Sequence, residues 1–179
     1  MDKLKGKSFE NYRNPILRVL LVFVAATFLV QSYQWYANVS KIPSGIKGHA
    51  VVFYEEMDSG MHISFVDTTD EYIYFAYSTI GVVAIYSKSG TYLCSYSFFS
   101  NTNGGLQMRC HEGSLYVNDH ADYEFVFNGT ELNEVRQPSE TEYTYGWYIE
   151  NRTLDIVIDN GRIYDVFGNY IMEAPGRLL

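Results

Sequence analysis

The chain has 179 residues, of which 21 are acidic, 13 are basic and 17 are tyrosine. Five basic and two acidic residues lie in the first eighteen positions, which leaves the remainder with a net charge of −11. A surface with that charge repels nucleic acid and anionic phospholipid headgroups, so nucleic-acid binding and phosphate binding are disfavoured.

An uncharged, apolar segment runs from Val19 to Val30. The basic residues before it are Lys3, Lys5, Lys7, Arg13 and Arg18, and the aromatic residues after it are Tyr33, Trp35 and Tyr36. A hydrocarbon core of about 30 Å requires about 20 helical residues. We therefore expect a transmembrane helix over residues 15–37, with Arg18 at one headgroup layer and the three aromatic residues at the other.

The excess of cations before this segment predicts that residues 1–14 form a basic cytoplasmic tail in a single-pass cell-membrane protein. Two alternatives remain. The segment also fits a cleaved secretory signal with a site at Val30-Gln31-Ser32, or a helix buried in a protein core. An anchor and a secretory signal both place the rest of the chain outside the cytoplasm.

Residues 38–49, which contain Pro43 and Gly45, read as a linker, and residues 50–179 read as one antiparallel β domain. Short runs of Tyr, Val, Ile and Phe alternate there with turns of Gly, Asn, Asp and Ser. The expected strands are Ala50–Glu55, His62–Val66, Glu71–Tyr77, Val82–Ser87, Thr91–Phe98, Leu106–Cys110, Ser114–Asn118, Tyr123–Phe127, Glu131–Val135, Tyr145–Glu150, Thr153–Ile158, Arg162–Asp165 and Tyr170–Glu173.

Three glycines mark a repeat in this domain. Gly90, Gly129 and Gly168 are spaced by 39 residues, and each precedes a predicted strand with further strands upstream. Four strands in about 40 residues are typical of a propeller blade. The alternative is an irregular antiparallel meander whose turns recur at similar spacing.

Over residues 61–174 the chain resembles the bladed β-propeller-type repeat families, with about three repeats. The resemblance implies an all-β, partial propeller-like domain that leaves apolar side chains exposed at both ends of an open stack. Two segments of the chain, Ala50–Glu55 and Gly176–Leu179, are candidates to cover these ends. Another copy of the chain and a partner subunit are the other candidates.

Cys94 and Cys110 lie on either side of the predicted turn at residues 100–105. If their strands form a hairpin, the two cysteines oppose each other and can form a disulfide outside the cytoplasm. If the strands belong to separate sheets, the cysteines are two buried thiols. The sequence leaves both states open.

Motifs that carry chemistry are scarce. The loop Asn118–Asp122 is polar enough to hold calcium, and its His120 is able to join His111 and Glu112 around a transition metal, but ordinary turn chemistry explains the same residues. Acid pairs such as Asp67 with Asp70, or Asp155 with Asp159, suit a glycosidase only if they flank a cleft. The sequence therefore predicts no catalytic residue, cofactor or metal ligand.

The tyrosines provide a candidate binding surface. We expect it among Tyr72, Tyr74, Tyr77, Tyr143, Tyr145 and Tyr148, because tyrosine combines a large contact area with a polar tip. Strand preference explains the same enrichment.

The sequence as a whole favours a membrane-anchored extracytoplasmic binding module. Its expected partners are the lipid bilayer, through the helix, and a protein partner, a homo-oligomer or an envelope ligand, through the β domain. The alternative is a surface hydrolase that acts on carbohydrate through loop carboxylates.

We predict that the intact chain stays with the membrane fraction after an alkaline wash, because lipid solvates its helix. External protease should digest the C-terminal domain in whole cells and leave a short protected N-terminal fragment. An intact chain in the aqueous fraction, with its C-terminal end sealed from external protease, contradicts this prediction.

Overall fold

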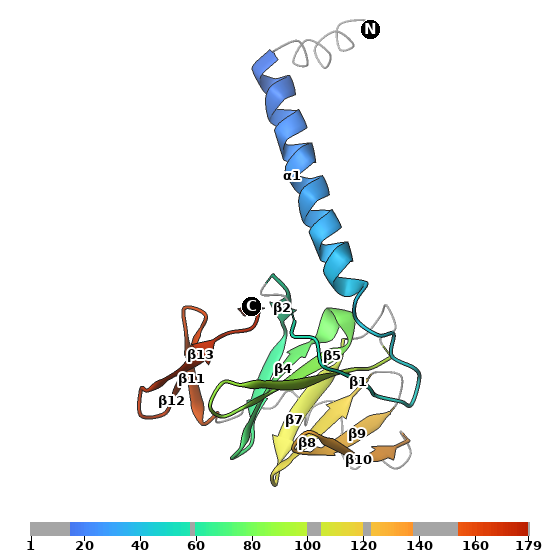
Figure 1. Cartoon of the computed structure of the whole chain (residues 1–179), viewed down its shortest axis with the longest axis vertical. Coiled ribbons are helices and arrows are strands. Elements are labelled where there is room, and N and C mark those ends of the chain that lie inside the picture. The colour runs from blue at the N-terminus through green and yellow to red at the C-terminus, as the bar shows by residue number, and fades with distance from the viewer. Residues whose placement is uncertain (1–14, 58–59, 100–104, 120–122, 138–153, 179) are drawn as a thin grey trace, which may run out of the picture. The chain divides into compact units, whose positions relative to one another are not determined.

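The computed structural model describes residues 15–57, 60–99, 105–119, 123–137 and 154–178 (Figure 1). The chain divides into two compact units, Met1–Lys41 and Ile42–Leu179, and we call the second unit the β domain. Each unit is described by itself below.

The first unit contains a single long helix, α1 (Pro15–Val39). Its segment Leu17–Val39 is long and apolar enough to cross a membrane, and none of the side chains in its most apolar part is buried. The helix is therefore a candidate membrane span. The helix extends two residues beyond the predicted span of 15–37.

The β domain is built around a five-stranded antiparallel sheet with the order β1-β6-β5-β4-β3. Its strands are β1 (Val51–Phe53), β3 (Phe65–Thr68), β4 (Tyr72–Tyr77), β5 (Val82–Ser87) and β6 (Tyr92–Ser97). A short 3-10 turn, Ser78–Ile80, joins β4 to β5. The predicted strand His62–Val66 is split at Ser64 into β2 (His62–Ile63) and β3.

Two more antiparallel meanders follow along the chain. A four-stranded sheet contains β7 (Gln107–His111), β8 (Ser114–Asn118), β9 (Glu124–Asn128) and β10 (Glu131–Arg136). A three-stranded sheet contains β11 (Ile156–Asp159), β12 (Arg162–Asp165) and β13 (Tyr170–Glu173). The predicted strand Tyr145–Glu150 lies outside the described residues.

The recurring glycines lie in equivalent hairpin turns. Gly90, Gly129 and Gly168 all have positive φ angles, and they occupy the turns β5–β6, β9–β10 and β12–β13. Gly129 has a second constraint, because a Cβ atom there would come within 2.8 Å of the Tyr72 ring. The antiparallel β architecture is confirmed, but none of the sheets formed by the described residues closes on itself.

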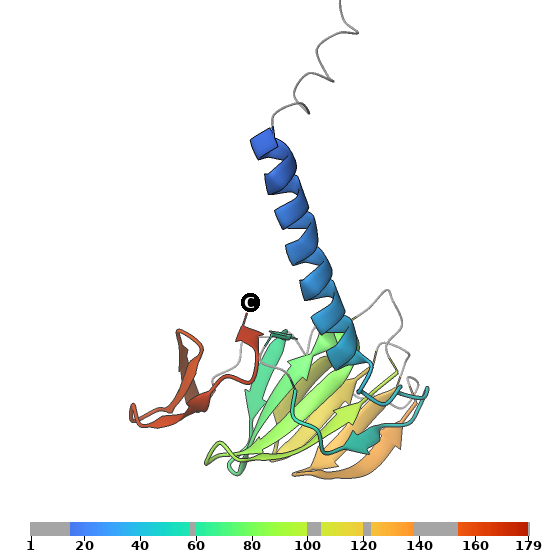
Figure 2. The ribbon, with the colours of Figure 1, turned by 45° about the horizontal axis from the view of Figure 1, so that its top comes forward.

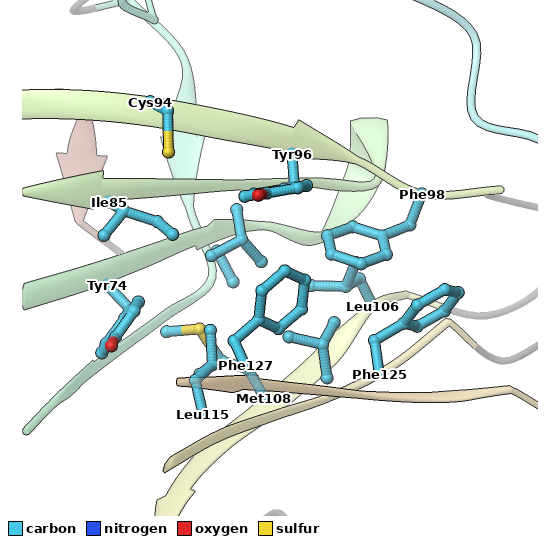
Figure 3. Close-up of a cluster of buried hydrophobic side chains, with 13 residues drawn as sticks. Tyr74, Ile85, Cys94, Tyr96, Phe98, Leu106, Met108, Leu115, Phe125 and Phe127 are labelled. Atoms are coloured by element: carbon cyan, nitrogen blue, oxygen red, sulfur yellow. The ribbon is translucent and has the colours of Figure 1, made fainter. Parts of the chain in front are cut away.

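The main core lies between the five-stranded and four-stranded sheets, which face each other (Figures 1 and 2). Figure 3 shows side chains from the two sheets meeting in this layer. Phe98 lies edge-on to Phe125, with ring centroids 5.0 Å apart, and Tyr96 lies edge-on to Phe127 at 4.8 Å. Such pairs add a specific aromatic contribution to the burial of apolar area.

The opposite face of the five-stranded sheet is buried as well. It carries Ile73, Phe75, Tyr77, Val82, Ala84 and Tyr86, and none of these side chains is more than 1% exposed. Buried side chains of the segment before β3, Met57, Met61 and Ile63, supply apolar cover for this sheet. The hydroxyl of Tyr86 donates a hydrogen bond to Glu56 Oε1 at 2.9 Å, which fixes the start of that segment.

Two of the expected covering elements join sheet edges. Strand β1 lies within the predicted Ala50–Glu55 and pairs with β6. Strand β14 (Arg177–Leu178), within the predicted Gly176–Leu179, pairs in parallel with β2. The close approach requires Gly176, because a Cβ atom there would lie 2.5 Å from the Met61 carbonyl oxygen.

We predict that Phe125→Ala destabilises the β domain by about 3–5 kcal/mol, because it leaves a cavity in the layer between the sheets. The matched control is Phe167→Ala, because Phe167 is 88% exposed and the loss of its ring should change stability by less than about 0.5 kcal/mol. Denaturant unfolding of the full chain in detergent measures both. Equal destabilisation by the two substitutions would place the core elsewhere.

Candidate functional site

The predicted tyrosine surface is wrong for Tyr74 and Tyr77, which are both fully buried. Alternation does send their side chains to opposite faces of the five-stranded sheet, but both faces are covered. Their hydroxyls cross to other elements: Tyr74 donates to the Gly129 carbonyl oxygen at 3.3 Å, and Tyr77 donates to the Pro175 carbonyl oxygen at 2.9 Å. Burial raises the pKa of both groups, so they act as neutral donors that fix the fold.

The other tyrosines predicted for that surface do not restore it. Tyr72 is half-buried and packs over the Gly129 turn. Tyr143, Tyr145 and Tyr148 lie outside the described residues, so their part of the prediction stays a prediction.

An outward aromatic row is present instead on the three-stranded sheet. Register places Val157, Tyr164 and Tyr170 side by side, and the rings of Tyr164 and Tyr170 are 6.0 Å apart. Val157 is 50% exposed and Tyr170 is 56% exposed. Asp159, Arg162 and Glu173 form the next row on the same side. We call these six residues the C-terminal face.

The turn at the end of this face presents two more apolar side chains, Val166 and Phe167, which we call the hairpin tip. Both are exposed, although hydrogen bonds hold the turn in place. Asp165 Oδ1 accepts the backbone N–H groups of Phe167 at 2.9 Å and Asn169 at 2.8 Å, and its Oδ2 accepts the Asn169 amide. These bonds lower the pKa of the Asp165 carboxyl and fix the backbone that displays Phe167.

The inner side of the three-stranded sheet packs against the rest of the β domain. Ile156 and Ile163 are buried there. A Cβ atom on Gly90 would lie 2.9 Å from the Cβ of Met172, so the glycine allows the β5–β6 turn to touch β13. In Figures 1 and 2 the three-stranded sheet lies beside the five-stranded sheet, away from the four-stranded one. The outer side of the three-stranded sheet, with the tyrosine row, is thereby left to solvent.

Asp155 provides the polar part of this junction. Its two carboxylate oxygens accept hydrogen bonds from the Thr68 hydroxyl and the Lys88 ammonium group. Partial burial raises the pKa of Asp155, but the bonds from Lys88 and Thr68 outweigh it and leave the pKa below its ordinary value. The carboxylate is therefore ionised at neutral pH and ties the three-stranded sheet to the five-stranded one.

The cysteines do not lie on one hairpin. Cys94 is on β6 and Cys110 on β7, in two different sheets, and no disulfide joins them in the structure. Cys94 belongs to the core layer, and burial raises the pKa of its thiol to about 11. The backbone N–H of Cys110 donates to buried Asp67 at 2.7 Å, which links β7 to β3.

A partly buried polar row crosses the outer side of the four-stranded sheet, and the sequence analysis missed it. Register aligns Gln107, Asn118, Glu124 and Arg136, and Glu124 is inaccessible to solvent. Arg136 Nη1 lies 3.4 Å from Glu124 Oε2, and Nη2 donates to Glu134 at 2.8 Å. A buried carboxylate beside a guanidinium is charge-compensated, so this row has a structural explanation.

Two of the acids suggested for hydrolysis have structural partners too. Asp67 accepts two backbone N–H groups, and Asp155 accepts the bonds described above. No group of three or more His, Cys, Asp or Glu side chains suited to a metal ion occurs among the described residues. His111 and Glu112 are neighbours at 3.7 Å, whereas His120 lies outside the described residues.

The sequence analysis also missed the C-terminal face, although the residues before Gly168 carry a signal for it. The turns at Gly90 and Gly129 have polar residues before the glycine, Ser89 and Asn128, whereas Gly168 follows Val166 and Phe167. Apolar residues in a tight turn indicate a display position, because such a turn is exposed. No protein-family model, curated protein or solved structure matches the chain.

We predict that the junction at Asp155 weakens in acid. Because its folded pKa lies below the unfolded value of about 3.9, its stabilisation is complete above about pH 5 and is lost as the pH falls through the folded pKa. Asp155→Asn should lack this contribution of up to about 1 kcal/mol at neutral pH and show a smaller acid dependence.

Hydrogen exchange of residues 154–178 as a function of pH measures this effect. The matched control is Asp159→Asn, since Asp159 is exposed and its recorded hydrogen bond is to neighbouring Asn160. An identical pH dependence of exchange in wild type and Asp155→Asn would contradict the role of Asp155.

Proposed function

We propose that this chain is a single-pass membrane protein whose β domain lies outside the cytoplasm and docks a protein partner, without catalysing a reaction. The observation that carries the proposal is the C-terminal face with its hairpin tip. This aromatic row, in which Tyr170 is exposed and Tyr164 is half-buried, lies next to a turn that displays phenylalanine, and its outer side has no role in the packing described for the β domain.

The composition of the face suits a protein interface. Tyrosine is enriched at binding hot spots because it buries a large area and loses few rotamers on binding. The bonds from Asp165 order the tip before any partner arrives, which reduces the entropy lost on association. Paired Arg162 and Glu173 form a polar border, with side chains that are 58% and 62% exposed.

The apolar helix and its preceding cations support the anchor and its direction. Three successive meanders, with a left-handed glycine before the last strand of each, support a propeller-like origin for the repeats. In that arrangement each sheet covers its neighbour, and an outermost sheet presents a face for docking. The C-terminal face belongs to such an outermost sheet.

The test uses the full-length chain in its native membrane. A photo-crosslinking amino acid at position 157 should give a discrete protein adduct, and Phe167→Ser and Tyr170→Ser should reduce its yield about tenfold or more, as expected for hot-spot residues. Tyr54→Ser is the matched control, because Tyr54 is 75% exposed and lies beyond β1, outside the face.

Two outcomes contradict the proposal. One is the absence of a protein adduct at position 157 in correctly folded chain. The other is an adduct whose yield is the same in the Phe167, Tyr170 and Tyr54 variants.

A further inference from the structure

We propose that the partner docked by the C-terminal face is a second copy of this chain, related by a two-fold axis that runs along the strands between β12 and β13. This inference rests on the proposed function, because it requires the face to bind protein. It adds the identity of that protein and the symmetry of the complex.

The strand register provides the geometric argument. Arg162 is directly opposite Glu173, and Tyr164 is directly opposite Tyr170, on neighbouring strands of the same sheet. A two-fold axis midway between those strands places β12 of one copy over β13 of the other without moving it along the strand. Each residue then faces the residue that was its cross-strand neighbour.

The resulting contacts are complementary in charge. Arg162 of each copy faces Glu173 of the other, so two new ion pairs form across the interface. Within one copy, Arg162 Nε already donates to Glu173 Oε1 at 3.0 Å, which shows that the two side chains reach the same place. Shared between two copies, the four groups form a closed network of alternating charge.

The apolar side chains also meet one another across the axis. The axis stacks Tyr164 of one copy on Tyr170 of the other, where sheets packed face to face lie about 10 Å apart. Because the rotation preserves position along the strands, the two hairpin tips meet at the same end of the interface. Phe167 and Val166 from both copies then cover one another, and an isologous interface closes without leaving a repeat of the patch exposed.

The net charge of the domain favours this face over its other surfaces for self-association. The chain after residue 18 has a net charge of −11, so most pairs of surfaces bring like charges together. The C-terminal face has one cation and two acids beside a neutral aromatic row. Repulsion between the distant acids is screened beyond about 8 Å at physiological ionic strength.

Membrane anchoring compensates for the small size of the face. A patch on one three-stranded sheet is smaller than the roughly 800 Å² per partner of a standard interface, so free domains should associate weakly. Confinement of both copies by their helices raises their effective concentration, as a linker does between two binding modules. The dimer is therefore expected in the bilayer and to dissociate on dilution into excess detergent.

The experiment measures energy transfer between donor- and acceptor-labelled full-length chains in neutral phosphatidylcholine vesicles at a fixed protein-to-lipid ratio. Wild type should give transfer that unlabelled wild type competes away. Arg162→Glu alone and Glu173→Arg alone each place like charges opposite one another and should weaken association by about tenfold or more.

Mixing the two variants is the decisive step. A mixture of donor-labelled Arg162→Glu and acceptor-labelled Glu173→Arg places two acids of one chain opposite two cations of the other. Energy transfer should therefore return to at least the wild-type level. The double variant Arg162→Glu with Glu173→Arg should also associate with itself. Circular dichroism and the unfolding midpoint confirm that each variant is folded.

The inference is overturned if wild type shows no transfer that unlabelled chain can compete away, or if the mixed variants associate no better than either alone. It is also overturned if the adduct at position 157 contains a different protein only, which leaves the proposed docking function standing. Loss of every adduct at position 157 overturns the docking function itself, so the two failures are distinguishable.

Discussion

The five-stranded sheet is apolar on both faces, and this constraint determines how the rest of the β domain is arranged. One face packs against the four-stranded sheet, where Phe98, Phe125 and Phe127 meet. The other face requires a second cover, to which buried Met57, Met61 and Ile63 contribute. A sheet with two apolar faces cannot stand at the end of a stack, because one face would be left in water.

The same constraint explains the number of tyrosines in the central strands. Tyrosine fills a half-buried pleat with an aromatic ring, and its hydroxyl must find a partner when the ring is buried. Tyr74, Tyr77 and Tyr96 each donate to a carbonyl oxygen of another segment. These bonds are made to turns and to the C-terminal segment, so the tyrosines determine where those segments lie.

The strands, the hairpin turns and the helix were predictable from the sequence because the residues that specify each of them are neighbours in the chain. A period of two residues locates a strand, and a glycine that adopts positive φ locates a hairpin turn, as Gly90, Gly129 and Gly168 show. The apolar helix was predictable from its length and composition. Strand ends were less accurate because pairing partners, rather than propensity, determine where a strand stops.

The location of the candidate site was not predictable in the same way, because it depends on contacts between distant segments. Alternation showed that Tyr74 and Tyr77 lie on opposite faces of a strand, but it contains no information on which faces are covered. Asp155 is fixed by Thr68 and Lys88, which are 87 and 67 residues away in the chain. Such long-range contacts, together with the approach of Gly90 to Met172, show which side of the three-stranded sheet is left to solvent.

In the proposed dimer, the apolar helix aids association of the C-terminal face by raising the local concentration of the chain. A small aromatic face binds weakly when the molecules are free in three dimensions, because association must offset the loss of translational and rotational freedom. A helix confined to a bilayer has already lost part of that freedom, which is why we propose association of so small a face there. In the proposed dimer, an acidic domain with one nearly neutral face would therefore associate only where its helix concentrates it.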